Sequence, residues 1–408
     1  MKLKISKLLV LSALFIGTIH AGGFQLNEHG ARAMGMGGAF TAVADDPSAM
    51  YFNGAGLTQL YGWNFMAGTS FIAPRSEFRG IYPDVTSYKT NAQTFVIPNG
   101  YATYGADKWA VGLSFNVPFG LGTEWPADWP GRYLALETDV RCYTITGEGA
   151  YKLLDNLSIS AGVVYSWGTV TITEKNPQTP FPGDAFITLN GKDNSAFGYN
   201  FGVLYKPIEK LSLGASFHSQ VKYNFTGTAT TVGDAHLVAL NELPAGAITA
   251  NLTTPFNLTF GAAYDVMPEL KLSLDFQYVG WKSYDTLAIE FANVPRVASP
   301  RLYDNSYIVR LGGEYKLTNT LSIEAGIYYD NNPVKPQYLN PSLPDANRLC
   351  PSIGLNYQVT PHLTAAASYL FIRSTELTVT NSLEGNPPFN GTYNSYANIG
   401  SISLSYSL

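Results

Sequence analysis

The sequence predicts an all-β fold, a 14-stranded antiparallel transmembrane β-barrel with a small N-terminal helical hatch inside its lumen. Three observations support this prediction. Apolar and polar residues alternate along many short segments, short turns and long polar loops alternate between them, and aromatic residues gather at both ends of the apolar face. The composition agrees, because only 13% of the residues are charged, against about 25% in soluble domains, while Tyr (27) and Gly (39) are abundant.

The first 21 residues have the features of a signal peptide. Lys2, Lys4 and Lys7 precede an apolar run from Leu8 to Ile19, which is too short to span a bilayer as a helix. The alternative, a retained membrane anchor, lacks a following stop-transfer pattern. Residues 1–21 are therefore predicted to be removed after Ala21 during export.

The period-2 pattern shows which face of each strand is apolar. From Leu270 to Tyr278 every second residue is apolar, and the residues between them include Ser273 and Asp275. A soluble sandwich would alternate in the same way, so this pattern alone does not identify a membrane barrel. The alternation of short and long connections indicates a membrane barrel, because only one rim of such a barrel faces the external medium.

Counting these segments gives fourteen strands, an even number that places both chain ends on the periplasmic side. The predicted strands are 63–72, 94–104, 108–118, 140–152, 156–172, 195–206, 210–225, 252–265, 269–284, 305–316, 320–332, 349–359, 361–379 and 392–408.

Aromatic residues mark two predicted interfacial girdles, one near the short turns and one near the long loops. The first contains Trp109, Tyr151, Tyr205, Tyr264, Tyr315 and Tyr357. The second contains Tyr143, Trp167, Tyr223, Tyr278, Tyr307, Tyr329 and Tyr369.

Residues 22–60 interrupt the strand pattern, and residues 61–408 are predicted to be the barrel. The segment is rich in Gly, Ala and Met, with short helices expected near 28–36 and 47–53. A 14-stranded lumen is too wide for side chains alone to fill, so this segment is predicted to plug it. The alternative is a periplasmic tail with no role in gating.

Several short motifs resemble those of the FadL/TodX family, outer-membrane transporters of long-chain fatty acids and aromatic hydrocarbons. They are Gly23-Phe24-Gln25-Leu26-Asn27 at the mature start, Ala44-Asp45-Asp46, Asn53-Gly54-Ala55, Phe119-Gly120-Leu121-Gly122-Thr123-Glu124-Trp125, and Leu343-Pro344-Asp345-Ala346-Asn347-Arg348. The family usually has Asn-Pro-Ala where this chain has Asn53-Gly54-Ala55, so Gly54 departs from the pattern. The resemblance runs over essentially the whole mature chain, and it implies a hatch inside the barrel and a kinked third strand.

In such a family the ligand leaves the lumen sideways, through a gap in the barrel wall. That gap requires the third strand to lose ladder hydrogen bonds locally. Asn116, Pro118, Phe119 and Gly120 suit this role, because Pro118 has no N–H and Gly120 permits a bulge. A kink is therefore predicted between Ser114 and Gly120. The alternative is that Pro118 merely ends the strand at the outer rim.

The resemblance implies that Phe24 inserts into the ligand pocket, although a packing role would explain it equally well. The strand parity predicts that Glu148, Lys222, Asp275, Arg310, Glu314 and Glu324 face the lumen. Arg310 or Lys222 could bind a fatty-acid carboxylate, since a buried charge needs a partner. The alternative is a network of ion pairs that only solvates the lumen.

The predicted function is uptake of hydrophobic small molecules, as a monomer in the bacterial outer membrane, in contact with membrane lipid and lipopolysaccharide. A general porin for polar solutes is the main alternative, and the plug argues against it. No Ser–His–acid group stands out among His29, His218, His236 and His362, so no enzyme is predicted. No metal or cofactor is expected, a net charge of −5 argues against nucleic acid, and Cys142 and Cys350 are not assigned to a bridge.

Overall fold

The computed structural model describes residues 23–178, 181–234, 236–237 and 242–408. The predicted signal peptide, residues 1–21, lies outside these residues. Among the described helices, none is long and apolar enough to cross a membrane.

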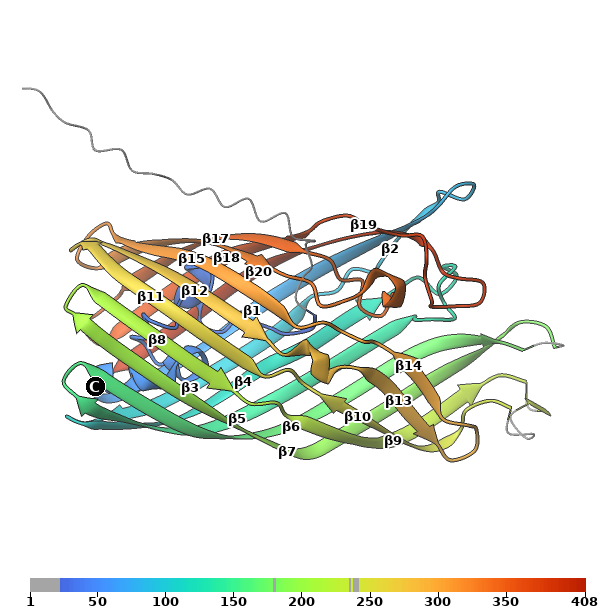
Figure 1. The fold of residues 1–408 in the computed structure, drawn as a ribbon, viewed down its shortest axis with the longest axis horizontal. Helices are drawn as coiled ribbons and strands as arrows, with labels where there is room; N and C mark the ends of the chain where they lie inside the picture. Colours follow the sequence, from blue (N-terminus) through green and yellow to red (C-terminus); the bar gives the residue numbers. More distant parts are fainter. Residues whose placement is uncertain (1–22, 179–180, 235, 238–241) are drawn as a thin grey trace, which may run out of the picture.

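The described chain forms a closed antiparallel barrel of 14 strands, as predicted (Figure 1). The last strand pairs with the first from Asn64 to Gly80, which closes the wall. Nine barrel strands are continuous: β1 (Gly62–Gly80), β3 (Phe95–Gly105), β4 (Trp109–Glu124), β5 (Glu137–Leu154), β6 (Leu157–Pro177), β7 (Asp184–Ile208), β16 (Leu321–Asp330), β17 (Arg348–Gln358) and β20 (Gly391–Ser407).

The other five barrel strands are interrupted near the level of the outer girdle. They are the pairs β8 (Leu211–His218) and β9 (Lys222–Val232), β10 (Gly246–Thr253) and β11 (Asn257–Met267), β12 (Leu270–Val279) and β13 (Thr286–Phe291), β14 (Val297–Pro300) and β15 (Ser306–Lys316), β18 (Leu363–Ser374) and β19 (Leu377–Val379). A short strand, β2 (Ser87–Lys89), pairs with the outer end of β1, and the 3₁₀ turns η2 (Trp281–Ser283) and η3 (Pro336–Tyr338) lie in the outer connections.

Side-chain burial confirms that the apolar face points outward over the membrane-spanning height. Along β12, Leu274 is 50% exposed and Phe276 is 45% exposed, whereas Ser273 and Asp275 are buried. A soluble sandwich would bury the apolar set, so lipid is the medium that this face fits. The girdle near the short turns is exposed throughout, as predicted.

Above the membrane the polarity of the wall is inverted. Tyr223 and Phe225 on β9, and Val221 directly before it, are buried in the lumen, while Lys222 and Asn224 are exposed. The inversion arises because the strand is irregular between His218 and Lys222, which shifts the two-residue alternation by one position. The predicted lumenal position of Lys222 is therefore wrong, and so is the predicted place of Tyr223 in the outer girdle.

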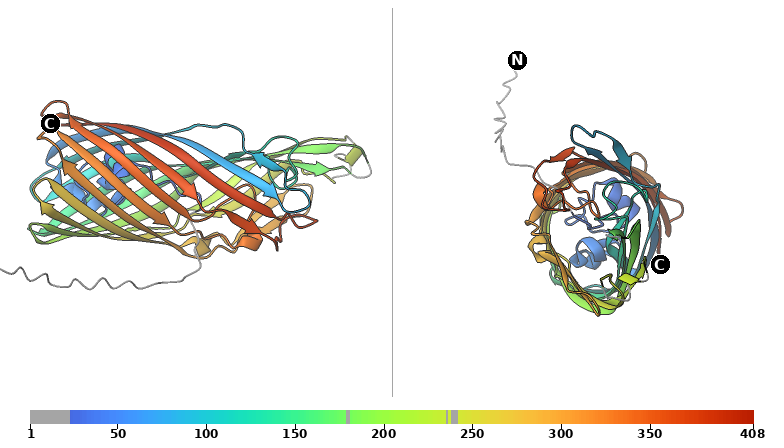
Figure 2. Two further views of the ribbon diagram at one scale, coloured as in Figure 1. Left: turned by 90° about the horizontal axis from the view of Figure 1, so that it is seen from above. Right: turned by 90° about the vertical axis from the view of Figure 1, so that its right-hand side faces the viewer.

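The hatch lies inside the barrel at the end with the short turns (Figure 2). It contains α1 (Ala31–Gly35), α2 (Ala49–Phe52) and the 3₁₀ helix η1 (Gly54–Gln59), and α1 packs against β17 and β18. Buried charges fix it to the wall. Arg32 contacts Glu314 at 2.6 Å and Asp45 at 2.6 Å, and the carboxylate of Asp275 accepts the backbone N–H of Thr41 at 2.9 Å.

Candidate functional site

The third barrel strand, β4, separates from its neighbour β3 halfway up the wall. Pairing of β3 with β4 ends at Gly100 and Phe115, and the β4–β5 register shifts between Asn116 and Phe119. The predicted kink between Ser114 and Gly120 is confirmed. Above it, β4 follows β5 and leaves the outer half of β3 without a partner on that side.

The N-terminal segment takes the place that β3 leaves. Gln25 and Phe119 form an isolated β-bridge, the N–H of Leu26 donates to the carbonyl of Pro118 at 2.9 Å, and the N–H of Gly120 donates to the carbonyl of Phe24 at 3.1 Å. The carbonyl of Pro118 and the N–H of Gly120 are thus satisfied from inside the lumen, which lowers the cost of leaving the wall open toward β3.

The resulting gap has defined edges. Its lower edge is the Gly100–Phe115 pair, and at its upper edge the N–H of Asn91 donates to the carbonyl of Glu124 at 2.7 Å. Between these edges the ring of Phe95 lies against Gly122, where a Cβ would overlap it.

A cavity of about 440 Å³ leads from the lumen to this gap. From inside it is lined by Phe24, Ile72 and Ile399, and from the outer face of the wall by Val96 and Tyr143. Tyr143 belongs to the outer girdle, so the cavity meets the membrane at its outer interface. An apolar molecule could pass between the two environments without crossing water.

A second cavity of about 380 Å³ lies toward the outer end of the barrel. Ile187, Leu189, Phe225 and Ile248 line it, so the inverted polarity of the outer wall produces its apolar surface. Phe24 lines this cavity as well as the one at the gap, and therefore stands between them.

The ring of Phe24 is held by a group of aromatic side chains, the Phe24 cluster, which comprises Phe24, Phe119, Trp281, Tyr284 and Tyr303. Phe24 meets Trp281 edge to face at 5.0 Å between centroids, and Phe119 and Tyr284 at 5.9 and 5.7 Å. Such pairs contribute about 0.5–1.5 kcal/mol each beyond their burial. Gly23 has a φ of +69° and lies directly on the Trp281 ring, where no larger residue would fit.

Two charged residues hold the start of this segment. The N–H of Gly23 donates to Oδ2 of Asp345 at 2.6 Å, and Nη2 of Arg348 donates to the carbonyl of Gly23 at 2.9 Å. Arg348 also bonds Oδ1 of Asp345 at 2.7 Å. Burial raises the pKa of Asp345, while the adjacent guanidinium of Arg348 opposes that shift.

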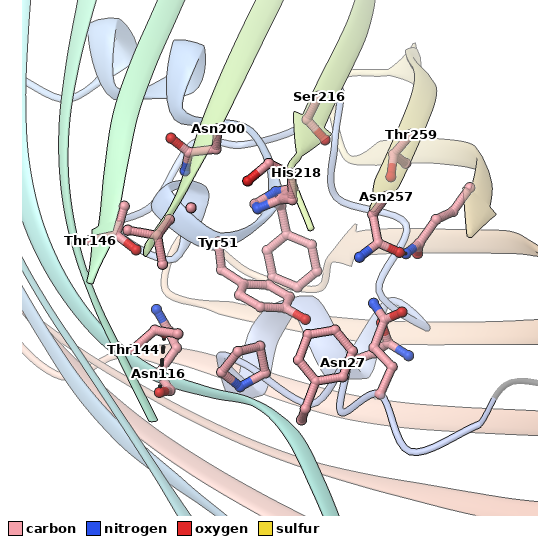
Figure 3. Close-up of a pocket in the computed structure, with 18 of the residues that line it drawn as sticks. Asn27, Tyr51, Asn116, Thr144, Thr146, Asn200, Ser216, His218, Asn257 and Thr259 are labelled. Atoms are coloured by element: carbon pink, nitrogen blue, oxygen red, sulfur yellow. Dashed lines mark hydrogen bonds between the residues drawn. The ribbon is translucent and has the colours of Figure 1, made fainter. Parts of the chain in front are cut away.

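A small polar chamber of about 90 Å³ lies on the other side of the N-terminal segment, above the hatch (Figure 3). Its wall contains neutral polar side chains, among them Asn116, Thr144, Asn200 and Asn257. Arg310 lines it too, buried in the lumen as predicted, and its Nη2 donates to Oδ1 of Asn27 at 3.2 Å.

Beside the chamber the hatch contains a buried imidazole, that of His29. Its ring is fully buried and lies 4.0 Å from that of Tyr51. Burial lowers the pKa of His29 to about 3, so the ring is neutral at pH 7.

The predicted hatch motif lies at the start of η1. Nδ2 of Asn53 donates to the carbonyls of Thr41 and Val203, both at 2.9 Å, and its Oδ1 accepts from the N–H of Ala55 at 3.2 Å. Asn53 thereby joins two parts of the hatch to β7, while Gly54 faces the side chain of Glu148 on β5.

The structure brings Phe24, Pro118, Phe119 and Gly120 together at the kink, whereas Arg310 lies in the polar chamber and Lys222 points outward. Sequence reasoning missed Trp281, Tyr284, Tyr303 and Arg301, which come from the irregular segments between β12 and β13 and between β14 and β15. The aromatic residues between 281 and 303 could have indicated an aromatic cluster. However, the period-2 pattern does not predict which way a side chain points where a strand is interrupted.

A closed barrel with an internal hatch, an opened wall and apolar cavities defines an outer-membrane transport protein rather than an enzyme. Residues 12–408 match the family model described as outer membrane protein transport protein (OMPP1/FadL/TodX), and the chain belongs to this family. It is thus an outer-membrane protein, and the expectation that it is not an enzyme is confirmed by the family.

Individual relatives agree. Outer membrane protein P1 of Haemophilus influenzae is 26% identical over 466 residues, covering 99% of both chains. The long-chain fatty acid transport protein of Escherichia coli O6:H1 is 25% identical, covering 90% of both. Among solved structures, a Pseudomonas aeruginosa FadL homologue matches with a TM-score of 0.85 and 22% identity, covering 95% of this chain and all (100%) of the other. The P. putida toluene transporter TodX matches with a TM-score of 0.73 and 17% identity, covering 94% and 99%.

Proposed function

We propose that this protein takes up hydrophobic small molecules, either long-chain fatty acids or aromatic hydrocarbons, and releases them sideways into the membrane through the gap between β3 and β4. The names of the relatives, a fatty acid transport protein and a toluene transporter, support the ligand class. The single observation that carries the route is the cavity at the kink, which is lined by residues of the lumen and by residues on the outer face of the wall.

The energetics favour this direction. An apolar ligand gains roughly 0.8 kcal/mol for each CH₂ that it moves from water into the bilayer. Movement down the lumen would instead bring it against the neutral polar wall of the chamber and the buried ion pairs of the hatch, such as Arg32 with Glu314. Polar groups that lose their partners are costly, so the downward path is unfavourable.

Phe24 is proposed to control passage between the two apolar cavities. It lines both of them and is held by ring contacts and by the backbone bonds of residues 23–26. A ligand that fills the outer cavity would compete with the ring for the same aromatic surface. Displacement of the ring would then join the outer cavity to the gap.

A general porin is the alternative function. The hatch argues against it, because Met36, Phe40 and Leu57 are fully buried between hatch and wall. Planar-bilayer recordings separate the two functions, since a porin would give a large steady ion current and a hydrophobic transporter would not.

The route is tested by closing the gap. Gly122→Trp would place an indole where Phe95 now meets Gly122, whereas Gly147→Trp on β5 adds the same group into open space. We expect Gly122→Trp to reduce uptake of labelled fatty acid or toluene by cells at least tenfold, and Gly147→Trp to leave it within twofold of the parent. Equal uptake by both variants would refute lateral release.

The contacts of the protein with its surroundings are also proposals. The exposed girdle near the short turns suits membrane lipid, as do Tyr278, Tyr307 and Tyr369 near the long loops. Outward lysines above them, such as Lys222, suit the phosphates of lipopolysaccharide. Each barrel has its own lumen and gap, which supports a working monomer.

A further inference from the structure

We propose that the polar chamber binds the head group of an amphiphilic ligand, namely a small neutral group that donates hydrogen bonds, such as the hydroxyl of a long-chain alcohol. The apolar tail would lie in the cavity at the wall gap. This inference rests on the proposed function, because it assumes that apolar chains occupy that cavity.

The first observation is the chemistry of the chamber wall. The side chains that surround it in Figure 3 are mostly amides and hydroxyls, contributed by β4, β5, β7, β8 and β11. The charged residues on it, Asp275 and Arg310, are cross-strand neighbours of opposite sign. The chamber thus offers neutral hydrogen-bonding groups set among apolar side chains such as Phe52 and Val164, a lining that fits a small neutral polar group better than a free ion.

The second observation is a set of unsatisfied acceptors. Oδ1 of Asn200, Oδ1 of Asp275 and Oε1 of Gln25 have no hydrogen-bond partner within the described part of the chain. Asn200 is 4% exposed and Asp275 is 1% exposed, and all three residues line the chamber. A buried acceptor needs a donor, from ordered water or from a ligand. A hydroxyl supplies one, while an ionised carboxylate and an alkane do not.

The third observation is the position of the chamber. Gln25 and Asn27 line both the chamber and the cavity at the gap. Along β4, Pro118 and Phe119 face the chamber, while Val117 and Gly120 face the gap. An amphiphile lying across the N-terminal segment could therefore place its head group at the unsatisfied acceptors of the chamber and its tail in the larger cavity at the gap.

The volumes agree with this arrangement. The chamber has about 90 Å³, against about 440 Å³ for the cavity at the gap. Since roughly 10–15 Å³ of such space accommodates one water molecule, the chamber can hold a head group of a few non-hydrogen atoms but no long chain.

The test compares three ligands of equal chain length, 1-dodecanol, dodecane and dodecanoate at pH 8, by equilibrium dialysis against the purified full-length protein in micelles, corrected with empty micelles. Gln25→Leu removes one unsatisfied acceptor, and Thr146→Val removes a hydroxyl from the chamber wall. Thr103→Val is the matched control, because Thr103 is buried in the lumen and does not line the chamber.

We expect Gln25→Leu and Thr146→Val to raise the Kd for dodecanol at least fivefold, and to change the Kd for dodecane less than twofold. Thr103→Val should change neither. If dodecanol and dodecane respond alike, or if dodecanoate loses as much affinity as dodecanol, the head-group site is wrong and the proposed uptake function stands. If the parent protein binds none of the three ligands, the head-group site is wrong, and if it does not bind toluene either, the proposed uptake function fails as well.

Discussion

Gly54 of the hatch lies directly against the carboxylate of Glu148 on β5, so that a Cβ at position 54 would overlap the Glu148 side chain. Glu148 is itself buried, and its Oε2 accepts from Nδ2 of Asn200 at 3.3 Å. The FadL family usually has proline at this position, and the backbone of Gly54 is not left-handed. The glycine is therefore explained by the neighbouring carboxylate and not by backbone geometry.

Gly54→Pro should consequently destabilise the hatch. The first position of a helix tolerates proline, so the expected cost of about 1–3 kcal/mol comes from overpacking against Glu148. Limited proteolysis of the hatch measures the effect. Adding Glu148→Ala to Gly54→Pro should restore resistance to the protease, and a double variant as sensitive as the single one would contradict this explanation.

The contact between Asp345 and the N-terminal segment gives a second prediction. Asp345→Ala leaves Arg348 without its closest carboxylate, and breaking a buried pair in this way costs about 3–5 kcal/mol. Hydrogen exchange of residues 23–28 should accelerate strongly. Asp304→Ala is the matched control, because its pair with Lys335 at 3.5 Å is exposed and should contribute at most about 1 kcal/mol. Equal exchange in the two variants would rule out Asp345 as an anchor.

A third prediction concerns pH. His29 has a pKa of about 3 when buried in the hatch, against 6.5 for an exposed histidine. Between these values His29 binds more protons when the hatch is displaced than when the hatch is packed in the barrel. The free energy that holds the hatch in the barrel therefore decreases as the pH falls from 6.5 toward 3, by up to about 4 kcal/mol. Proteolysis of the hatch at pH 7 and pH 4.5 should show this loss. His29→Gln should reduce it, whereas a change at the exposed His362 should have no effect; an unchanged pH response in His29→Gln would show that other groups cause it.

The ligand class can be resolved by comparing three cations. Arg301 lines the outer apolar cavity and is 6% exposed. Its nearest carboxylate, that of Glu384, lies 3.8 Å away, and its Nε has no hydrogen-bond partner among the described residues. If the ligand is a fatty acid, Arg301→Gln should weaken binding of the ionised acid about tenfold, since a hydrogen bond to a charged group contributes about 1.5–3 kcal/mol.

The same binding measurement also tests Lys222 and Arg310, the two cations that the sequence predicted to bind a fatty-acid carboxylate. Lys222→Gln should leave binding unchanged, because Lys222 points out of the barrel. Arg310→Gln tests the earlier assignment of the carboxylate to the polar chamber, and a larger loss there than in Arg301→Gln would restore it. Toluene binding should be unaffected in all three variants.

The membrane-spanning half of the fold could be predicted because lipid imposes one rule on every strand. Each predicted barrel strand is present, and residues such as Leu274 and Asp275 face the sides that parity assigned to them. The rule holds only while the alternation is unbroken. Beyond His218 the alternation shifts by one residue, so that Lys222 and Tyr223 point to the sides opposite to those predicted.

The kink was predictable because Pro118 and Gly120 mark it locally, but the arrangement around Phe24 was not. Phe24, Phe119, Trp281 and Tyr303 come from four distant parts of the chain, and Trp281 and Tyr303 lie in irregular segments. Their meeting depends on barrel closure and on the path of the hatch, which no local pattern encodes. The hatch boundaries at residues 22 and 60 remain predictions.

The seat of residues 23–26 has a consequence for assembly. Their partners are Pro118 and Gly120 on β4, Trp281 after β12, and Asp345 with Arg348 before and within β17, so no single stretch of nascent chain can receive them. The first residues of the described chain are therefore expected to be the last to settle. Until then the outer edge of β4 has unpaired backbone groups, which makes this edge the part of an unfinished barrel most open to mispairing.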